Sequence, residues 1–183
     1  MKIDILFLNN EMNGHDEYFD NDLFQEYCET HSFEGKKNQI LSVPPSYSKS
    51  ENLTFLVGLG ENKEDINFYD LGTIIGSKIY SDAEIKFLNV VEDTNLIIDG
   101  ILYVQYKFNN YKSEDDSSVN NIIFQDLDSS ENEIKKNSVF WVRDLINTPA
   151  LDKSPEEFIN KVKELVDSSG IEVEVYDLSL IHI

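Results

Sequence analysis

Residues Trp141–Phe158 read WVRDLINTPALDKSPEEF and contain the end of one predicted helix and the start of another. The segment Asn147–Pro149 ends the first helix, because proline cannot donate an amide and disfavours the α conformation in the residue before it. Ser154 begins the second, because its side chain can cap free amides, Pro155 suits the first helical position and Glu157 completes a capping box. The stretch therefore predicts two helices joined by a short connector.

The pattern continues on both sides of this stretch. Apolar residues at helical spacing predict a first helix over 133–146 and extend the second to about residue 166. Ser168-Ser169-Gly170 ends it, and Ile171, Val173 and Val175 alternate with glutamates as in a β-strand. We expect this part to be a connecting helix followed by the first helix and strand of a second α/β domain.

The preceding residues alternate between strand-like and helix-like patterns. Such alternation favours an α/β fold with a parallel or mixed sheet. The polar, acidic segment 126–132 is the expected boundary, which gives domains 1–130 and 131–183. The expected strands are 3–8, 39–43, 53–59, 85–90 and 119–124, and the expected helices are 23–27, 66–80 and 94–108.

Three segments together resemble the leucyl aminopeptidase family, the dinuclear-metal exopeptidases. Arg143–Phe158 is similar to the hinge of that family, although Leu151 stands where the family usually has asparagine. Phe55–Gly60 (FLVGLG) is similar to its Val-Gly-Leu-Gly strand end, and Asp99–Lys112 to its Glu-Gly-x-x-Leu…Tyr-x-Phe-x-x-Tyr-Lys segment. The resemblance covers about residues 50–178.

The resemblance implies a macro-like N-terminal domain with a mixed central sheet between helices, followed by a hinge. It also implies a cytoplasmic parent that removes N-terminal residues from peptides, uses two divalent metal ions (zinc or manganese) and assembles as a hexamer. The family's Asp-Ser-Gly-Gly and Asn-Thr-Asp-Ala-Glu-Gly-Arg segments do not occur in this sequence. We therefore expect no catalytic, metal or cofactor-binding residue, an inactive chain, and a truncated reading frame ending at Ser179–Ile183.

Composition narrows the classes of partner. The net charge of −20 repels phosphate backbones and disfavours nucleic-acid binding. No apolar run is long enough to span a membrane, and the N-terminus has no secretory pattern, so we expect a cytoplasmic protein. Cys28 is the only cysteine, which excludes a disulfide framework and a thiol-based zinc site. A solvated acidic surface is the simplest interpretation of the charge, and an acidic interaction domain without a ligand remains an alternative.

Few residues suggest chemistry. Gly58 and Gly60 follow a strand, so a free-standing macro-like module binding ADP-ribose or a related nucleotide is the alternative, against a tight turn that needs small residues. His15, His31 and His182 have no histidine or cysteine at metal-ligand spacing, and His15 and His31 are expected to be exposed. The carboxylates Glu114–Asp116 are expected in a solvated loop, and Arg143 and Asp144 in contacts around the hinge.

Overall fold

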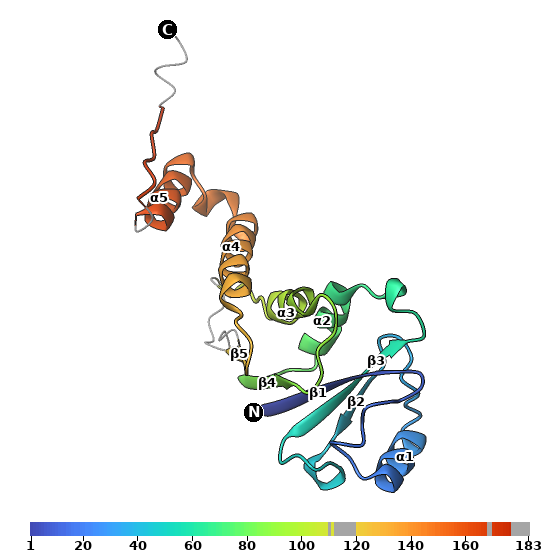
Figure 1. The fold of residues 1–183 in the computed structure, drawn as a ribbon. Helices are drawn as coiled ribbons and strands as arrows, with labels where there is room; N and C mark the ends of the chain where they lie inside the picture. The colour runs from blue at the N-terminus through green and yellow to red at the C-terminus, as the bar shows by residue number, and fades with distance from the viewer. Residues whose placement is uncertain (110, 112–119, 168–169, 177–183) are drawn as a thin grey trace. The chain divides into compact units, whose positions relative to one another are not determined.

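The computed structural model describes residues 1–109, 111, 120–167 and 170–176. By its internal contacts, the chain divides into two compact units, Met1–Phe140 and Trp141–Ile183, with helix α4 (Ser130–Asn147) running through the division. The elements of the first unit are coloured blue to yellow in Figure 1. They are, in order, β1 (Lys2–Asn9), α1 (Asn21–Thr30), β2 (Ile40–Val43), a 3₁₀ turn (Pro45–Tyr47), β3 (Leu53–Gly60), a 3₁₀ turn (Lys63–Asp65), α2 (Phe68–Gly76), β4 (Ala83–Phe87), α3 (Thr94–Tyr103) and β5 (Ile122–Phe124).

The first unit is built on a five-stranded mixed sheet with strand order β2-β3-β1-β4-β5. Strand β2 pairs antiparallel with β3, and the other neighbouring strands pair in parallel. The first strand of the chain lies at the centre, with Ile3 opposite Leu53 on one side and Ile85 on the other. A mixed sheet in an α/β fold confirms the expected fold class.

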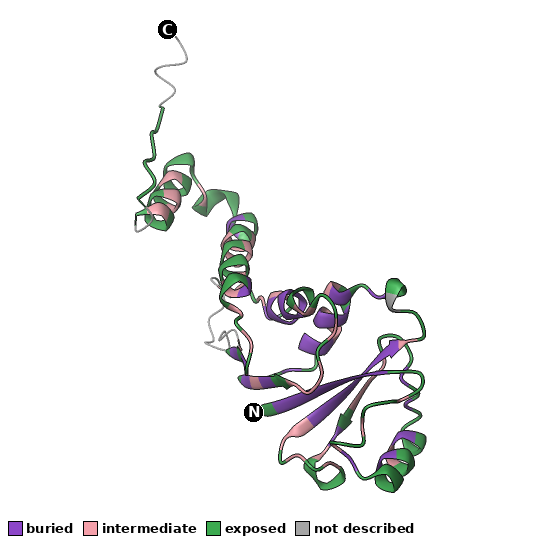
Figure 2. Cartoon of the chain, viewed as in Figure 1, coloured by how far each residue is buried: buried purple, intermediate pink, exposed green. Residues whose placement is uncertain are grey.

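Helices cover both faces of the sheet, as Figure 1 shows. On one face, alternate residues of β1 and β3 pack with α2 and α3 in the larger core cluster. On the other face, Leu6, Leu8 and Leu56 pack with Phe24 and Cys28 of α1. Because both faces are covered, β1 and β3 are nearly continuous runs of buried apolar residues. Figure 2 shows this buried material in the strands and on the inner sides of the helices.

Helices α2 and α3 pack at backbone distance. A Cβ added to Gly72 would lie 2.2 Å from the Ile97 carbonyl oxygen, and one added to Gly100 would lie 2.2 Å from that of Tyr69. The facing helix therefore leaves no room for a side chain at either position, and glycine has none. The Asp99–Leu102 segment singled out in the sequence thus contributes to helix packing.

The second unit contains the end of α4, a 3₁₀ turn (Ala150–Asp152) and helix α5 (Pro155–Val166). The predicted cap by Ser154 is confirmed: Ser154 Oγ accepts a hydrogen bond from the Glu157 amide at 3.2 Å. The strand expected at 171–175 is wrong, because residues 171–176 adopt neither helix nor strand. Alternation of apolar residues makes a strand possible, but a strand forms only by pairing with a neighbour.

Several predicted boundaries shift. Helix α1 begins at Asn21 instead of 23, because Asp20 caps it by accepting a hydrogen bond from the Asp22 amide. The helices expected over 66–80 and 94–108 are shorter, at Phe68–Gly76 and Thr94–Tyr103. Part of the strand expected at 119–124 lies outside the described residues, and β5 itself spans Ile122–Phe124.

Candidate functional site

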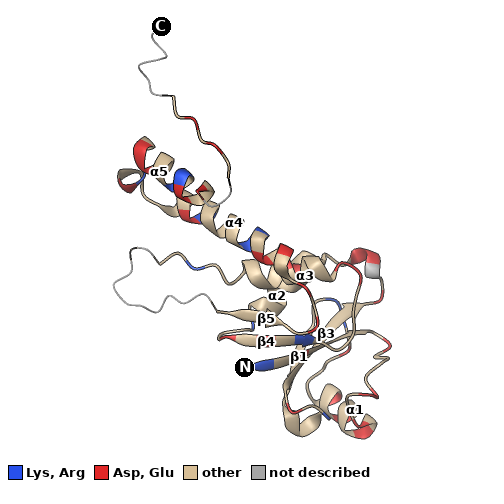
Figure 3. Cartoon of the chain, turned by 60° about the vertical axis from the view of Figure 1, so that its left-hand side comes forward, with Lys and Arg blue, Asp and Glu red and all other residues tan. Residues whose placement is uncertain are grey.

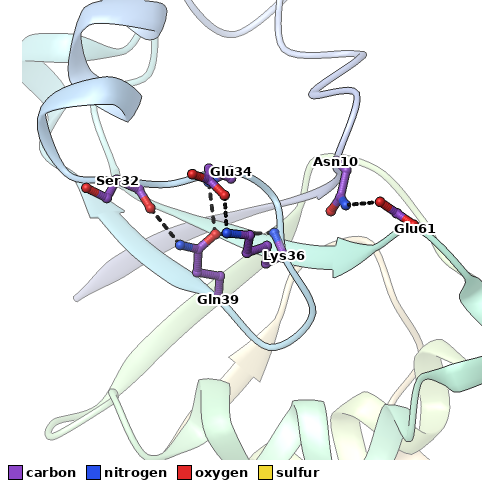
Figure 4. Close-up of polar contacts among 6 residues, drawn as sticks. All are labelled: Asn10, Ser32, Glu34, Lys36, Gln39 and Glu61. Atoms are coloured by element: carbon purple, nitrogen blue, oxygen red, sulfur yellow. Dashed lines mark hydrogen bonds and ion pairs between the residues drawn. The ribbon is translucent and has the colours of Figure 1, made fainter.

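The carboxyl ends of β1 and β3 are the natural place to look for a ligand site. Ligands of open α/β sheets bind beyond the carboxyl ends of parallel strands, where loops diverge. Here Asn10 follows β1 and Glu61 follows β3, and the Asn10 amide nitrogen donates to Glu61 Oε1 at 3.2 Å. The loop 32–39 lies beside them, as Figure 4 shows, and Gly60 N donates to Gly35 O at 2.8 Å.

One side chain holds the loop 32–39 in shape. Gln39 Oε1 accepts hydrogen bonds from the amides of Glu34 at 2.9 Å and Lys36 at 3.2 Å, and Gln39 Nε2 donates to the Ser32 carbonyl at 2.7 Å (Figure 4). Lys36 also forms an ion pair with Glu34. These contacts fix the loop without any ligand, so the strand ends have a preformed rim.

The glycines that suggested nucleotide binding are explained by this loop. A Cβ on Gly58 would lie 2.0 Å from the Lys36 carbonyl oxygen, and Gly60 has a φ of +76° with Lys37 directly beside it. Both positions need glycine so that the backbone of the loop can approach β3. They therefore give the ADP-ribose alternative no support.

Asn10 lines two cavities. The smaller, of about 260 Å³, is lined by Asn10, Lys36, Lys37, Leu59, Gly60, Glu61, Asn62 and Asp65. Its two ammonium groups already have partners, because Lys37 Nζ donates to the Asp65 carbonyl and Lys36 pairs with Glu34. This cavity is therefore poorly suited to a large anion.

The larger cavity, of about 450 Å³, contains the histidine that sequence reasoning placed wrongly. It is lined by Asn10, Glu11, Met12, His15, Phe24, Gln25, Cys28, Glu29, Phe33 and Glu34. The His15 side chain was expected to be exposed, but it is only 14% exposed. Its ring stacks on Phe24, with centroids 3.9 Å apart and an interplanar angle of 11°. Phe24, the fourth residue of α1, covers the His15 ring, and the polar sequence around His15 gave no sign of this.

Within the part of the chain that the structure describes, the other candidate residues form no catalytic group. His31 is exposed, as expected, with its ring 4.4 Å from that of Tyr27. His182 and Glu114–Asp116 lie outside the described residues. The thiol of Cys28 is buried, and burial raises its pKa to about 11, so it is protonated at neutral pH and not a reactive nucleophile.

The described residues also do not fit the pair of divalent metals that the family resemblance implies. Over the ranges 1–109, 111, 120–167 and 170–176, no three histidine, cysteine, aspartate or glutamate side chains converge closely enough to hold a metal ion. Sites for such metals need several oxygen or nitrogen ligands around each ion. We therefore derive no catalytic step from these residues.

Sequence reasoning missed one buried polar contact that joins α4 to the first unit. Asn132 is 2% exposed, and its amide nitrogen donates to Asp99 Oδ1 at 2.8 Å and to the Asn95 carbonyl at 3.0 Å. A carboxylate inside a helix and an asparagine at a helix start each look ordinary in sequence. Only the hydrogen bond between Asn132 and Asp99, seen in the structure, identifies these residues as the attachment of α4.

The hinge segment forms an apolar groove within the second unit. A cavity of about 450 Å³ is lined by Val142, Leu145, Ile146, Lys153, Ser154, Pro155 and Phe158. Lys153 Nζ donates to the Leu145 carbonyl at 2.6 Å and so ties the connector to the end of α4. Helix α5 has no buried residue, and Leu151 is 96% exposed. Arg143 and Asp144, on the same stretch of α4, are partly exposed.

The surface charge follows the composition. The chain has 35 acidic residues against 15 basic ones, and Figure 3 shows acidic residues on the helices and loops of both units. Among the described residues, no helix combines the length and the hydropathy needed to cross a membrane.

The curated proteins to which this chain is similar share one name, probable cytosol aminopeptidase. No family model matches the chain. A probable cytosol aminopeptidase of Clostridium tetani is 26% identical over 181 residues, which cover 85% of this chain and 36% of the relative. One of Rickettsia massiliae is 30% identical over 170 residues, covering 78% of this chain and 33% of the relative. The chain thus spans about a third of the length of the curated relatives it matches.

Solved structures show the same fold. The cytosol aminopeptidase of Coxiella burnetii matches with a TM-score of 0.71 and 21% identity over 100% of this chain and 39% of its own. A tomato leucine aminopeptidase mutant matches with a TM-score of 0.68 and 15% identity over 99% of this chain and 42% of its own. The bottromycin maturation enzyme BotP in complex with Mn matches with a TM-score of 0.71 and 15% identity over 99% of this chain and 39% of its own. The resemblance seen in the sequence is confirmed: this chain is a relative of the cytosol (leucyl) aminopeptidases and corresponds to about a third of their length.

Proposed function

We propose that this chain is the N-terminal, non-catalytic part of a leucyl aminopeptidase-like metallo-exopeptidase. The main support is that 85% of this chain matches a probable cytosol aminopeptidase, whereas the match covers only 36% of that relative. The described residues contain a folded α/β unit and a hinge-like segment, without a cluster of metal ligands. On this proposal, the role of this part is structural.

The parent protein, on this proposal, releases N-terminal amino acids from peptides in the cytoplasm. Two divalent ions, zinc or manganese, would be held by residues outside this chain, and the parent would assemble as a homo-hexamer. Residues 1–130 would form the N-terminal domain, and 131–183 the connecting helix, the hinge and the start of the catalytic domain. The acidity of the chain argues against nucleic acid as a partner.

The reading frame of the encoding DNA tests the proposal directly. We expect the frame to run past the codon for Leu178 into segments encoding Asp-Ser-Gly-Gly and Asn-Thr-Asp-Ala-Glu-Gly-Arg. A stop codon directly after the codon for Ile183, with no such segments further on in the same frame, would refute the proposal for this gene.

An assay on the purified chain tests the non-catalytic role. We expect no release of nitroaniline from leucine p-nitroanilide with added Mn²⁺ or Zn²⁺, because the described residues include no cluster of three or more metal ligands. The full-length Clostridium tetani relative serves as the positive control. Metal-dependent turnover by the purified chain that a chelator abolishes would show that the role is not purely structural.

A further inference from the structure

Asn13 and Gly14 form the single Asn-Gly pair of the sequence. They lie in a turn between β1 and α1, and both residues are exposed. In such a pair the backbone nitrogen of the glycine can attack the side-chain carbon Cγ of the asparagine, because glycine has no side chain to block the approach. Asparagine is accordingly one of the thermolabile residues of proteins. The fold around the turn decides whether the two groups can react.

The nitrogen that would attack is the amide of Gly14. In the part of the chain that the structure describes, no group accepts a hydrogen bond from this amide. Gly14 has a φ of +90°, and a Cβ built on it would meet no atom within 4 Å, so the space around the residue is open. Water can reach the amide and remove its proton, which makes the nitrogen a nucleophile. The fold therefore does not protect Gly14.

The side chain that would be attacked is held by one weak contact. Asn13 Nδ2 donates a hydrogen bond to Glu11 Oε2 at 2.9 Å. Both side chains are exposed, so water competes for this hydrogen bond and it contributes little to fixing the amide group. The Asn13 side chain can therefore turn toward the Gly14 nitrogen at a small cost in free energy.

Comparable pairs elsewhere in the chain are protected by helices. The single Asp-Gly pair, Asp99-Gly100, is buried inside α3. Asn137 is followed by the small residue Ser138, but both lie inside α4. In a helix, the amide of the following residue donates to the carbonyl four residues before it, and the regular backbone keeps that amide in place. Only the turn at Asn13 combines the reactive pair with an open backbone.

We propose that Asn13 is a site of spontaneous modification to isoaspartate. The Gly14 nitrogen loses its proton and bonds to Asn13 Cγ, and Asn13 Nδ2 leaves as ammonia, which produces a cyclic imide. Water then opens the ring by adding a hydroxyl group to one of the two carbonyl carbons and a hydrogen to the nitrogen. The product is isoaspartate or aspartate, depending on which bond is cleaved. The reaction requires only water and is independent of the proposed structural role.

Isoaspartate at position 13 would change the turn that holds His15. The modified backbone is one methylene longer between Met12 and His15, where His15 Nδ1 lies 2.6 Å from the Met12 carbonyl oxygen. The His15 ring also stacks on Phe24, and Met12 packs against the same core cluster. The new carboxylate adds one negative charge to a chain whose net charge is already −20. The modification therefore loosens the contacts that hold this turn against α1.

Incubation of the purified chain at pH 8, followed by peptide mass spectrometry, tests the site. Trypsin releases residues 3–36 as one peptide, which also contains Asn9, Asn10 and Asn21 as internal controls. We expect the mass gain of deamidation at Asn13 alone. Its rate should lie within about fivefold of that of a free peptide of residues 11–16, since an exposed hydrogen bond is the restraint on the side chain. The rate should also be about tenfold higher at pH 8 than at pH 7, because the ionised fraction of the amide rises by that factor.

Transfer of a labelled methyl group by a protein isoaspartate methyltransferase identifies the product, and two variants serve as controls. In Asn13→Gln the attack would have to close a ring one atom larger, so we expect neither deamidation at this position nor methyl labelling. Asn21→Gln, which changes an exposed asparagine at the start of α1, should label like the wild type.

The proposal would be overturned if Asn13 stayed intact in the native chain while the free peptide reacted, because the fold would then keep the two groups apart. Equal labelling of Asn13→Gln and the wild type would also overturn it, as would a product that is aspartate alone. The comparison with the free peptide needs only the wild-type chain, so it decides the question if Asn13→Gln does not fold.

Discussion

Replacing Gly100 by alanine should destabilise the first unit, although alanine is the better helix former. The added Cβ would lie 2.2 Å from the Tyr69 carbonyl oxygen and 2.8 Å from the Thr73 amide nitrogen, and both are backbone atoms that cannot rotate away. An ordinary contact needs about 3.4 Å, so α2 and α3 must separate by about 1 Å, which forfeits a large share of the dispersion energy between them.

The two opposing effects can be weighed. Glycine to alanine in a helix interior gains about 1 kcal/mol, whereas overpacking a tight interior costs about 1–3 kcal/mol and sometimes more. Because this clash is with backbone, we place the cost at the upper end and expect a net loss of about 2 kcal/mol. In a domain of this size, that loss lowers the melting temperature by about 4–8 °C.

Urea unfolding, followed through NMR amide signals of β1, confines the measurement to the first unit. Asn95→Ala is the matched control, because Asn95 is exposed on the same helix and its replacement should gain about 0.5 kcal/mol. If Gly100→Ala is as stable as the wild type within about 0.5 kcal/mol, the helices are not held at backbone distance and the packing argument is wrong.

Three further predictions concern single contacts. Ser154→Ala removes the cap on the Glu157 amide and should cost helix α5 about 1 kcal/mol, visible as faster hydrogen exchange in its first turn; unchanged exchange would mean that the cap is not formed in solution. Native Cys28 should react slowly with iodoacetamide at pH 8 and rapidly in urea, because burial raises the pKa of its thiol to about 11. The same shift means that the stability of the fold decreases as the pH rises above about 9, where only the thiol of the unfolded chain ionises. Rapid labelling of the native chain would contradict this prediction. Gln125 donates a hydrogen bond to Glu84 and holds the pKa of that carboxyl below its usual range. Gln125→Ala should therefore destabilise the fold at pH 7, and progressively less in acid as the carboxyl becomes protonated. An equal effect on stability at pH 3 and pH 7 would exclude this cause.

The sheet was predictable from sequence because its signals are local. Continuous apolar runs at 3–8 and 53–59 identify strands buried on both faces, and Ser154-Pro155 identifies a helix start without tertiary information. The strand expected at 171–175 failed because pairing, unlike alternation, needs a neighbour that the local sequence does not specify. The order of the helices and strands in the first unit was predicted correctly, whereas their lengths depended on capping residues such as Asp20.

The candidate site was much less predictable, because its parts meet only in three dimensions. The sequence around Gly58 and Gly60 favoured a tight turn over a ligand loop, and the close approach of the Lys36 backbone supports the turn. His15 lies in a polar stretch, and its burial depends on Phe24, which belongs to another element. The residues next to His15 in the sequence therefore did not predict the residues that surround it in the structure.

The central position of β1 has a consequence for how the chain is made. Strand β1 is synthesised before both strands to which it is hydrogen-bonded, β3 and β4, whose paired residues begin at Leu53 and Glu84. Until residue 87 has been synthesised, β1 is an apolar segment without its second partner. Folding of the sheet must therefore wait for contacts of long sequence separation, which are slow to form. During synthesis, β1 is thus an apolar segment that needs protection from aggregation until its partners are made.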